Sequence, residues 1–394
     1  MEINFKQYLM AILFFMLIAG VFISCKNKSI ATTEIQVVKK EIDINLENVK
    51  DSSLDIGKYY PNVTILPLKG KSGYMVGEIN KVVYYKDRIY VLDRTFSKAL
   101  LIFDKSGNPI DSIKDEFILD FAINNDIIYV LRARENRINM YDVKDNSFVK
   151  GFPVLPQNIM NIEVVDDHIL CYRLIIPKNI DRYDNCSLFL INKDNGEVLK
   201  QWLPINEKNQ FLSYFKTYSS VFRKVDDLIY FSRNYDNNQY CLKDGELVVE
   251  KLLQIKNIFP FDKLVTKNEF DFVEQVNQSG KPYSIEGYFE IPELDFFRVI
   301  NNNLINSLIS VKSEKPNNRT IYKRFHHSKT LVPFDHLFQV SDKAFGSFVP
   351  TSLIFDLKSR ISHFDLKTNK DPFVELLSDF KETNLQPVLV LMSK

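Results

Sequence analysis

The sequence predicts an all-β fold, a six-bladed β-propeller of four-stranded antiparallel blades that follows an N-terminal signal segment. Three observations predict it. First, the 394 residues are 45% hydrophobic and rich in Phe and Tyr, which supplies a large core and favours strands because flat side chains fit a pleated surface. Second, one strand phrase recurs along the chain. Third, helical periodicity is nearly absent after the first segment.

The first 24 residues have the pattern of an export signal. Lys6 precedes the apolar run "LMAILFFMLIAGVFI" at residues 9–23, which is shorter than the roughly 20 residues that span a bilayer. The stretch "FISC" resembles the lipobox of bacterial lipoproteins, with Phe22 in place of the usual aliphatic residue. The resemblance implies lipidation of Cys25, and the alternative is an ordinary cleaved signal. We therefore expect a lipoprotein signal peptide at 1–24, a tether at 25–55 and the propeller at 56–394.

The lipid anchor implies a membrane-bound protein of the bacterial cell envelope. The tail after Cys25 lacks the acidic cluster of a surface-export tag, which favours the outer membrane facing the periplasm. In such an oxidising compartment, Cys171 and Cys186 flank a polar excursion and can pair across it. With Cys241 they make an odd number without zinc-like spacing, so buried free thiols are the alternative.

A four-residue phrase marks the start of one strand in each repeat. The phrase "DRIY" at residues 87–90 returns as "DIIY" at 126–129, "DHIL" at 167–170 and "DLIY" at 227–230. Each copy is a turn carboxylate, a spacer and the start of an apolar strand. In the first repeat another strand precedes the phrase ("KVVYY") and two follow it ("LLIFD" and "PIDSI"). Each repeat therefore holds four strands.

Four short strands repeated at about 40 to 60 residues are typical of a propeller blade. One four-stranded sheet cannot cover its own two faces, whereas blades around an axis cover one another. Four clear copies lie between residues 79 and 255, and two degenerate copies fit between 285 and 377. An early run at residues 63–68 can supply the strand that closes the ring. Five or seven blades, a β-sandwich and two stacked β domains are the alternatives.

Two segments carry a resemblance to a known family. The stretch "GEINKVVYYKDRIYVLDRTFSKALLIFDKSGN" resembles the first blade of the six-bladed, NHL-like propeller lipoproteins of Bacteroides-type bacteria. The end, "ETNLQPVLVLMSK", resembles the terminal strand of that family, with Gln386 in place of Asn. The resemblance implies the fold and export of the chain, and it implies no particular activity.

Charged residues recur where the second strand of each blade ends. Four positions after the strand start, the first blade has Asp93, followed by Arg94, and the later blades have arginines: Arg132, Arg173, Arg233 and Arg298. Because these loops lie at one end of a propeller, the pattern predicts a basic ring at the channel mouth that binds an anion. The alternative is a set of solvated side chains, each paired with a nearby Asp or Glu.

A weaker candidate is a metal site on the channel axis. Oxygen-bearing side chains near the starts of the first strands are its possible ligands: Glu78, Asn80, Asp120, Asn161 and Glu163. The five histidines lack ligand spacing, and there is no Gly-rich phosphate loop, nucleophile elbow or Cys/His pair. We therefore expect no cofactor, with calcium or zinc only under the enzyme alternative. Trp202 is expected to fasten a blade from its outer strand.

These observations favour a binding or interaction module over an enzyme. We expect a monomer that offers one loop-rich face to an anionic small molecule, a glycan or an envelope protein, with excursions at residues 175–185 and 276–288. The formal net charge of +1 gives no electrostatic footprint for nucleic acid. The alternative function is a calcium- or zinc-dependent propeller hydrolase or lyase.

Overall fold

The computed structural model describes residues 31–70, 75–173, 186–204, 221–233, 236–260, 269–301, 304–312, 319–334, 337–341, 343–360, 371–379 and 387–394. The predicted signal peptide, Cys25 and the excursion at 175–185 lie outside these residues. Among the helices of the described part, none is long and apolar enough to cross a membrane.

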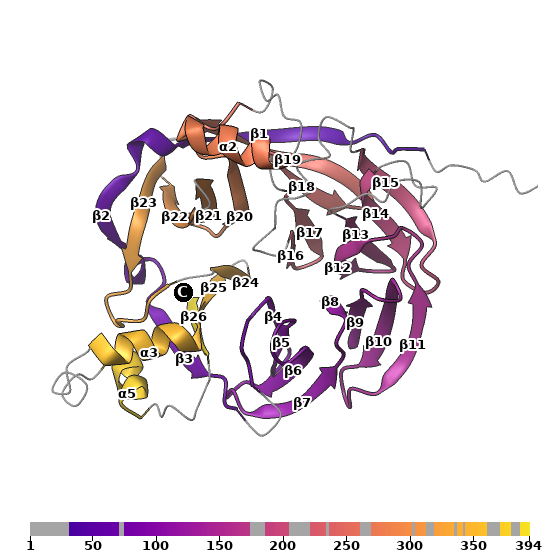
Figure 1. Ribbon diagram of the computed structural model, residues 1–394, viewed down its shortest axis with the longest axis horizontal. Helices are drawn as coiled ribbons and strands as arrows, with labels where there is room; N and C mark the ends of the chain where they lie inside the picture. The colour runs from indigo at the N-terminus through magenta and orange to yellow at the C-terminus, as the bar shows by residue number, and fades with distance from the viewer. Residues whose placement is uncertain are drawn as a thin grey trace, which may run out of the picture.

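Six antiparallel sheets stand around a common centre, as the predicted propeller requires (Figure 1). The first blade consists of β4 (Lys81–Tyr85), β5 (Arg88–Asp93), β6 (Ala99–Asp104) and β7 (Pro109–Lys114). The second consists of β8 (Ile118–Asn124), β9 (Ile127–Arg132), β10 (Arg137–Asp142) and β11 (Phe148–Pro153). The third consists of β12 (Ile159–Val165), β13 (His168–Arg173), β14 (Cys186–Asn192) and β15 (Val198–Pro204). In each blade the strands pair in chain order, from the innermost to the outermost.

The fourth and fifth blades repeat this order and gain a fifth strand each. They are β16 (Phe222–Val225), β17 (Leu228–Phe231), β18 (Asn238–Lys243) and β19 (Glu246–Lys256); and β20 (Ser284–Glu290), β21 (Leu294–Asn301), β22 (Leu304–Lys312) and β23 (Arg319–His326). The N-terminal strands β1 (Gln36–Asn45) and β2 (Lys50–Asp55) add to them in parallel, β1 beside β19 and β2 beside β23.

The sixth blade closes the ring with strands from both ends of the chain. It consists of β24 (Phe338–Ser341), β25 (Ala344–Val349), β26 (Val388–Ser393) and β3 (Asn62–Pro67). Strand β3 pairs antiparallel with β26, from Asn62 opposite Ser393 to Pro67 opposite Val388. This confirms that the early apolar run supplies the closing strand.

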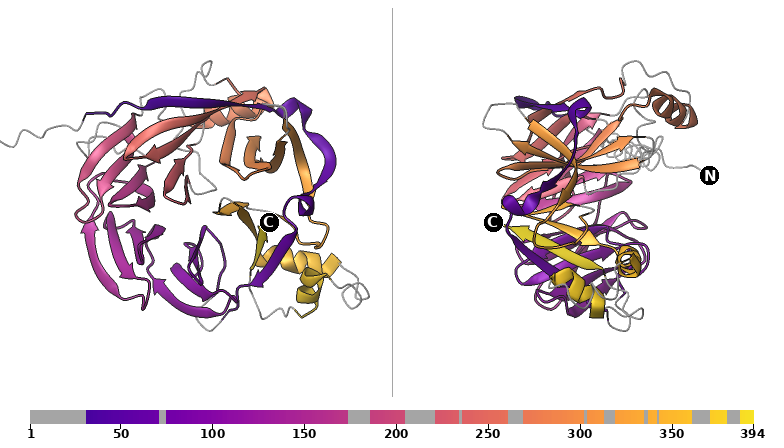
Figure 2. Two further views of the ribbon diagram at one scale, coloured as in Figure 1. Left: turned by 180° about the vertical axis from the view of Figure 1, so that it is seen from behind. Right: turned by 90° about the vertical axis from the view of Figure 1, so that its left-hand side faces the viewer.

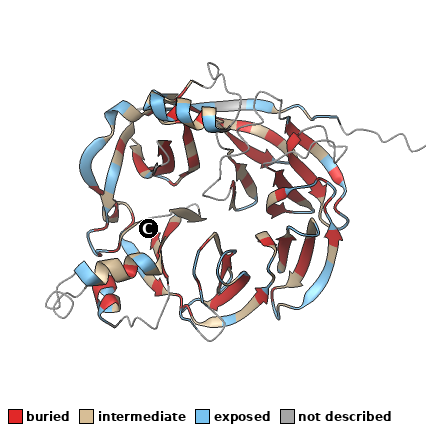
Figure 3. Ribbon diagram, in the orientation of Figure 1, coloured by how far each residue is buried: buried red, intermediate tan, exposed pale blue. Residues whose placement is uncertain are grey.

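The local sequence explains both strands and turns. The middle strands β5 and β6 are apolar along their length and almost wholly buried, because both faces of a blade pack on neighbouring blades (Figure 3). The turns after the innermost strands need a left-handed backbone, and residues such as Asp166 (φ 50°) and Asp226 (φ 51°) supply it. These left-handed residues stand directly before the recurring carboxylate of the sequence phrase, and of those carboxylates only Asp126 itself has a positive φ (63°).

Residues 36–55 were predicted to belong to a tether, but they are folded into strands of the propeller. They form the strands β1 and β2. A short 3-10 helix follows each strand, at Leu46–Asn48 after β1 and at Ile56–Lys58 after β2. Ile42 and Ile44 are buried against Leu253 and the fifth blade, so this segment gains hydrophobic burial that a solvated tether lacks. Before β1, the backbone N–H of Thr33 donates to the Gln201 carbonyl in the third blade at 2.8 Å.

Three helices also depart from the sequence prediction. Helix α2 (Glu269–Ser279) runs into the excursion at 276–288, which was expected to be a flexible loop. Helices α3 (Thr351–Arg360) and α5 (Pro372–Asp379) lie between β25 and β26, so the third strand of the sixth blade falls beyond residue 377. Ile354, Phe373 and Leu377 bury in the core shared by the fifth and sixth blades, which holds these helices in place. In the left view of Figure 2 the three helices lie at the outer edge of the ring, and in the right view α2 stands off to one side of the sheets.

The cysteines and the tryptophan have structural roles. Cys171, Cys186 and Cys241 are buried and are not in disulfide bonds, so the pairing of Cys171 with Cys186 is not formed. Burial raises the pKa of the Cys241 thiol to about 11, which makes it unreactive at neutral pH. Trp202 is fully buried in the outer strand β15, as expected for a residue that fastens a blade.

Candidate functional site

A cavity of about 430 Å³ lies where the innermost strands of all six blades meet. Its polar lining comes mainly from the third, fourth and fifth blades and from Lys81 of the first. Its apolar lining comes mainly from the first and sixth blades: Ile79, Val83, Ile89, Phe338, Phe348 and Leu389. This size is within the usual range of small-molecule pockets, and the lining combines an apolar wall with a few charged groups.

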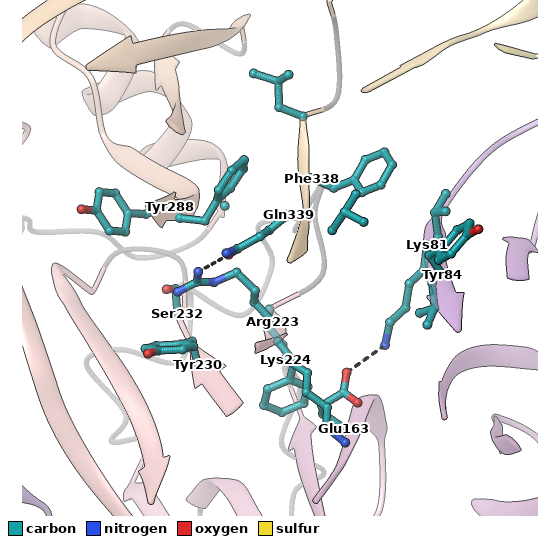
Figure 4. A pocket seen from close by; sticks show the side chains of 18 of the residues that line it. Lys81, Tyr84, Glu163, Arg223, Lys224, Tyr230, Ser232, Tyr288, Phe338 and Gln339 are labelled. Carbon is teal, nitrogen blue, oxygen red and sulfur yellow. Dashed lines mark hydrogen bonds and ion pairs between the residues drawn. The ribbon is translucent and has the colours of Figure 1, made fainter. Parts of the chain in front are cut away.

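Arg223 is the central polar residue on one side of the cavity (Figure 4). Strand β16 places it at the channel, and its guanidinium lies over the Tyr230 ring, 4.2 Å from the ring centroid. Its Nη1 donates to the Gln339 side-chain carbonyl of the sixth blade. Nε and Nη2 are buried and have no hydrogen-bond partner among the described residues. Burial lowers the pKa of Arg223, although an arginine remains ionised at any physiological pH.

Lys81 lies on the other side of the cavity, at the start of β4 (Figure 4). Its ammonium lies 3.2 Å from Asp120 Oδ1 and 3.6 Å from Glu163 Oε2, and it donates to the Phe121 carbonyl at 2.7 Å. Burial alone lowers the pKa of Lys81, but the two carboxylates outweigh it and raise the pKa above its ordinary value. Lys81 is thus fully paired within its own chain.

Glu163 and Lys224 complete this second cluster. The Lys224 ammonium donates to the Val164 carbonyl at 2.7 Å and to Asn124 Oδ1 at 2.8 Å. Burial raises the pKa of Glu163 and lowers the pKa of Lys224. The cluster formed by Lys81, Asp120, Glu163 and Lys224 therefore satisfies its charges internally.

The predicted metal ligands meet only in part. Asp120, Asn161 and Glu163 converge as expected, with Asn161 Nδ2 donating to Asp120 Oδ2 at 3.3 Å. The cation between the two carboxylates is the Lys81 ammonium. Glu78 and Asn80 instead bond to each other and to the loop after β5. Among the described residues, no group of three or more His, Cys, Asp or Glu side chains can hold a metal ion.

The predicted basic ring is not brought together around one opening. Asp93 is buried and accepts the backbone N–H groups of Gly77, Thr95 and Phe96 at 2.8 to 3.0 Å, so it holds the loop. Arg94 is exposed and donates to the Leu119 carbonyl at 3.4 Å. Neither residue lines the cavity.

The predicted arginines divide into two groups. Arg132 pairs with Asp115 and, at 2.7 Å, with Glu135, and Arg173 is buried over the Phe189 ring, where it donates to the Cys186 carbonyl. Both lie outside the cavity lining. Arg233 and Arg298 do line the cavity, and they lie 2.9 Å from Asp236 and 3.7 Å from Glu286.

Sequence reasoning missed Arg223, Lys81 and Lys224. It sought basic residues along the second strand of each blade and only oxygen-bearing side chains near the first strand, whereas the first, innermost strand lines a propeller channel. The available signal was basic residues on otherwise apolar first strands, one in "KVVYY" and two in "FRKV".

Comparison with known proteins supports the fold. Residues 32–286 match the family DUF5128, which is described as a 6-bladed beta-propeller. The chain belongs to this family. A search of curated proteins finds no match.

A solved structure with a similar fold supports this architecture. A Bacteroides fragilis protein described as exported is 14% identical, with a TM-score of 0.71 over 90% of this chain and 100% of that chain. Kuenenia stuttgartiensis hydrazine synthase is 7% identical, with a TM-score of 0.39 over 76% of this chain and 84% of that chain. The Neurospora crassa Pan2 WD40 domain is 12% identical, with a TM-score of 0.35 over 80% of this chain and 75% of that chain. At 14% identity, the likeness to the Bacteroides fragilis protein shows the fold alone.

Proposed function

We propose that this propeller is a binding module whose small-molecule ligand occupies the central cavity. The observation that carries the proposal is a cavity of about 430 Å³ with an apolar wall from the first and sixth blades and Arg223 facing it from the fourth. An enzyme would need reactive groups at the ligand, and two of the lining carboxylates, Glu163 and Glu286, lie beside the cations Lys81 and Arg298. The ligand therefore binds in the channel and not on the loop-rich face predicted from the sequence.

The experiment is a titration with a neutral apolar fluorescent probe, N-phenyl-1-naphthylamine. Val83 lines the cavity from β4, so Val83→Phe fills part of the space and should weaken probe binding about tenfold. Ile110→Phe is the matched control, because Ile110 is exposed on the outer strand β7. Equal probe binding by the two variants and the unchanged protein would contradict a ligand site in the cavity.

We further propose that the module is anchored through Cys25 on the outer membrane and faces the periplasm. The lipobox-like "FISC" supports this, as does the fold shared with a protein described as exported. Cys25→Ser should move the protein from the membrane to the soluble fraction and abolish labelling by an alkyne-bearing palmitate. Labelling that persists in this variant would refute the anchor.

A further inference from the structure

We propose that the ligand is an amphipathic monocarboxylate, whose carboxylate pairs with Arg223 and whose apolar part lies along the first and sixth blades. This rests on the proposed function, since it names the ligand class of the same cavity. Three features of the cavity carry it.

The first feature is the unmet hydrogen-bonding capacity of Arg223. Nε–H and one N–H of Nη2 point the same way and form the fork that grips a carboxylate through two parallel hydrogen bonds. In Arg223 these are the two nitrogens without a partner among the described residues. A buried charged donor without an acceptor is costly, so a bound carboxylate removes a cost that the protein otherwise carries.

The second feature is that no anion among the described residues pairs with Arg223. The guanidinium forms no ion pair with a described residue, and Gln339, its one acceptor there, is neutral. Glu290 and Glu250 lie near enough to influence Arg223, but they lie 2.8 Å and 3.0 Å from Lys251. The remaining described contact of the guanidinium is the face of the Tyr230 ring, which is not an anion.

The third feature limits the charge of the ligand. Lys81 and Lys224 are engaged within the chain, and Arg233 and Arg298 each face an acidic side chain. Glu163 and Glu286 also line the cavity and offset the charges of Lys81 and Arg298, so these pairs add little net charge to the lining. One available guanidinium therefore suits a single carboxylate better than a dianionic phosphate.

The apolar wall selects the rest of the ligand. Phe338, Phe348 and Leu389 of the sixth blade and Ile79, Ile89 and Val83 of the first line the cavity. Hydrocarbon against this wall gains about 25 cal/mol per Å² of apolar surface removed from water. Binding requires the guanidinium to turn toward the cavity, because Nε and Nη2 are covered, and the carboxylate replaces the neutral Gln339 contact.

The experiment compares octanoate, 1-octanol and octylamine, which share one chain length, by calorimetric titration into the full chain carrying Cys25→Ser. Octanoate should bind at least about tenfold more tightly than octanol, since a charge-assisted bidentate pair contributes more than about 1.4 kcal/mol, and octylamine should not bind detectably. Arg223→Gln and Arg223→Lys should each abolish the preference for octanoate and leave octanol affinity within about twofold. Arg94→Gln, an exposed arginine outside the cavity lining, is the matched control and should change neither affinity.

The outcomes separate the two proposals. Octanol binding as tightly as octanoate, or a preference that survives Arg223→Gln, overturns the carboxylate assignment and leaves the cavity site standing. Failure of N-phenyl-1-naphthylamine and of all three octyl compounds to bind the unchanged protein overturns both. Both Arg223 variants should keep the melting temperature within a few degrees, because the native side chain has unpartnered donors; if they unfold instead, the comparison of octanoate with octanol in the unchanged protein decides the assignment.

Discussion

Lys81 and Arg223 face each other across one cavity, at the starts of the first and fourth blades, and both are cations on an innermost strand. Lys81 has two carboxylates and a backbone carbonyl within 3.6 Å. Arg223 has one neutral amide and an aromatic ring, and two of its nitrogens lack a partner among the described residues. Neighbouring charges therefore distinguish a cation that holds the fold from one that is available to a ligand.

The difference arises from the carboxylates nearest to each cation. Asp120 and Glu163 come from the innermost strands β8 and β12 and point at Lys81 across blade boundaries. Glu290, on β20, is the corresponding neighbour of Arg223, but it turns outward to Lys251 and Lys312. The pairing of Glu290 with these lysines thus leaves Arg223 without a counter-ion in the part of the chain that the structure describes.

Removal of Lys81 should have the largest effect on stability. Lys81→Met leaves Asp120 and Glu163 buried without their cation, so the free energy of unfolding should fall by about 3–5 kcal/mol. Urea unfolding followed by fluorescence measures the change. Lys105→Met is the control: that lysine forms an exposed pair with Asp87 at 3.8 Å, and its loss should have no measurable effect.

A small fall in the free energy of unfolding for Lys81→Met would mean that the two carboxylates take up protons or find other partners. Lys81 would then not be held by its carboxylates, and it would be as available to a ligand as Arg223 is. The double variant Lys81→Met with Glu163→Gln sharpens the test. It removes one of the two uncompensated charges, so it should recover part of the lost stability.

The pH dependence of stability should report the ion pairs of Glu290 with Lys251 and Lys312. Burial opposes ionisation, but Lys251 and Lys312 outweigh it and lower the pKa of Glu290 to about 2. Because the folded state holds this proton less tightly than the unfolded chain, the stabilisation is complete above about pH 4.5 and is lost as pH falls toward 2. Glu290→Gln should remove about 2 kcal/mol of this acid-dependent loss, measured by urea unfolding between pH 2 and 6.

The exposed Glu116 offers a matched control, since Glu116→Gln should leave the pH profile unchanged. If Glu290→Gln leaves the profile unchanged too, Glu290 is not held by the lysines. It could then turn toward Arg223, and the absence of a counter-ion at the cavity would lose its explanation.

The fold could be predicted wherever one repeat follows another in the chain. The turn carboxylates at Asp126, Asp167 and Asp227 mark blades whose strands are consecutive, so a local phrase is enough. The sixth blade joins β3 to β26 across more than 300 residues and admits α3 and α5 between two of its strands. The run at residues 63–68 could be named as the closing strand only because the ring must close, and no local pattern places α3 and α5 inside the sixth blade.

The candidate site was harder to predict than the fold for a related reason. Position along a strand can be counted from sequence, and the count correctly placed Arg132 and Arg173 at the ends of second strands. Whether a side chain faces the channel depends on which strand is innermost and on how the blades tilt. The partners of Arg173 and Glu163 lie on other strands, so their burial and pairing are visible only in three dimensions.

The smallest effect is expected for Arg132, which tests whether arginines at the strand ends contribute to binding at all. Its guanidinium is about three-quarters covered and pairs with Asp115 and Glu135 in its own blade, and such partly exposed pairs contribute about 0.2–1 kcal/mol. Arg132→Gln should therefore lower the free energy of unfolding by less than about 1 kcal/mol and leave octanoate affinity unchanged, because the side chain lies outside the cavity lining. A tenfold fall in octanoate affinity would instead show that an anion reaches the loops at the channel mouth. A cation with carboxylate partners would then take part in binding, and the absence of such partners would no longer identify the cation that binds the ligand.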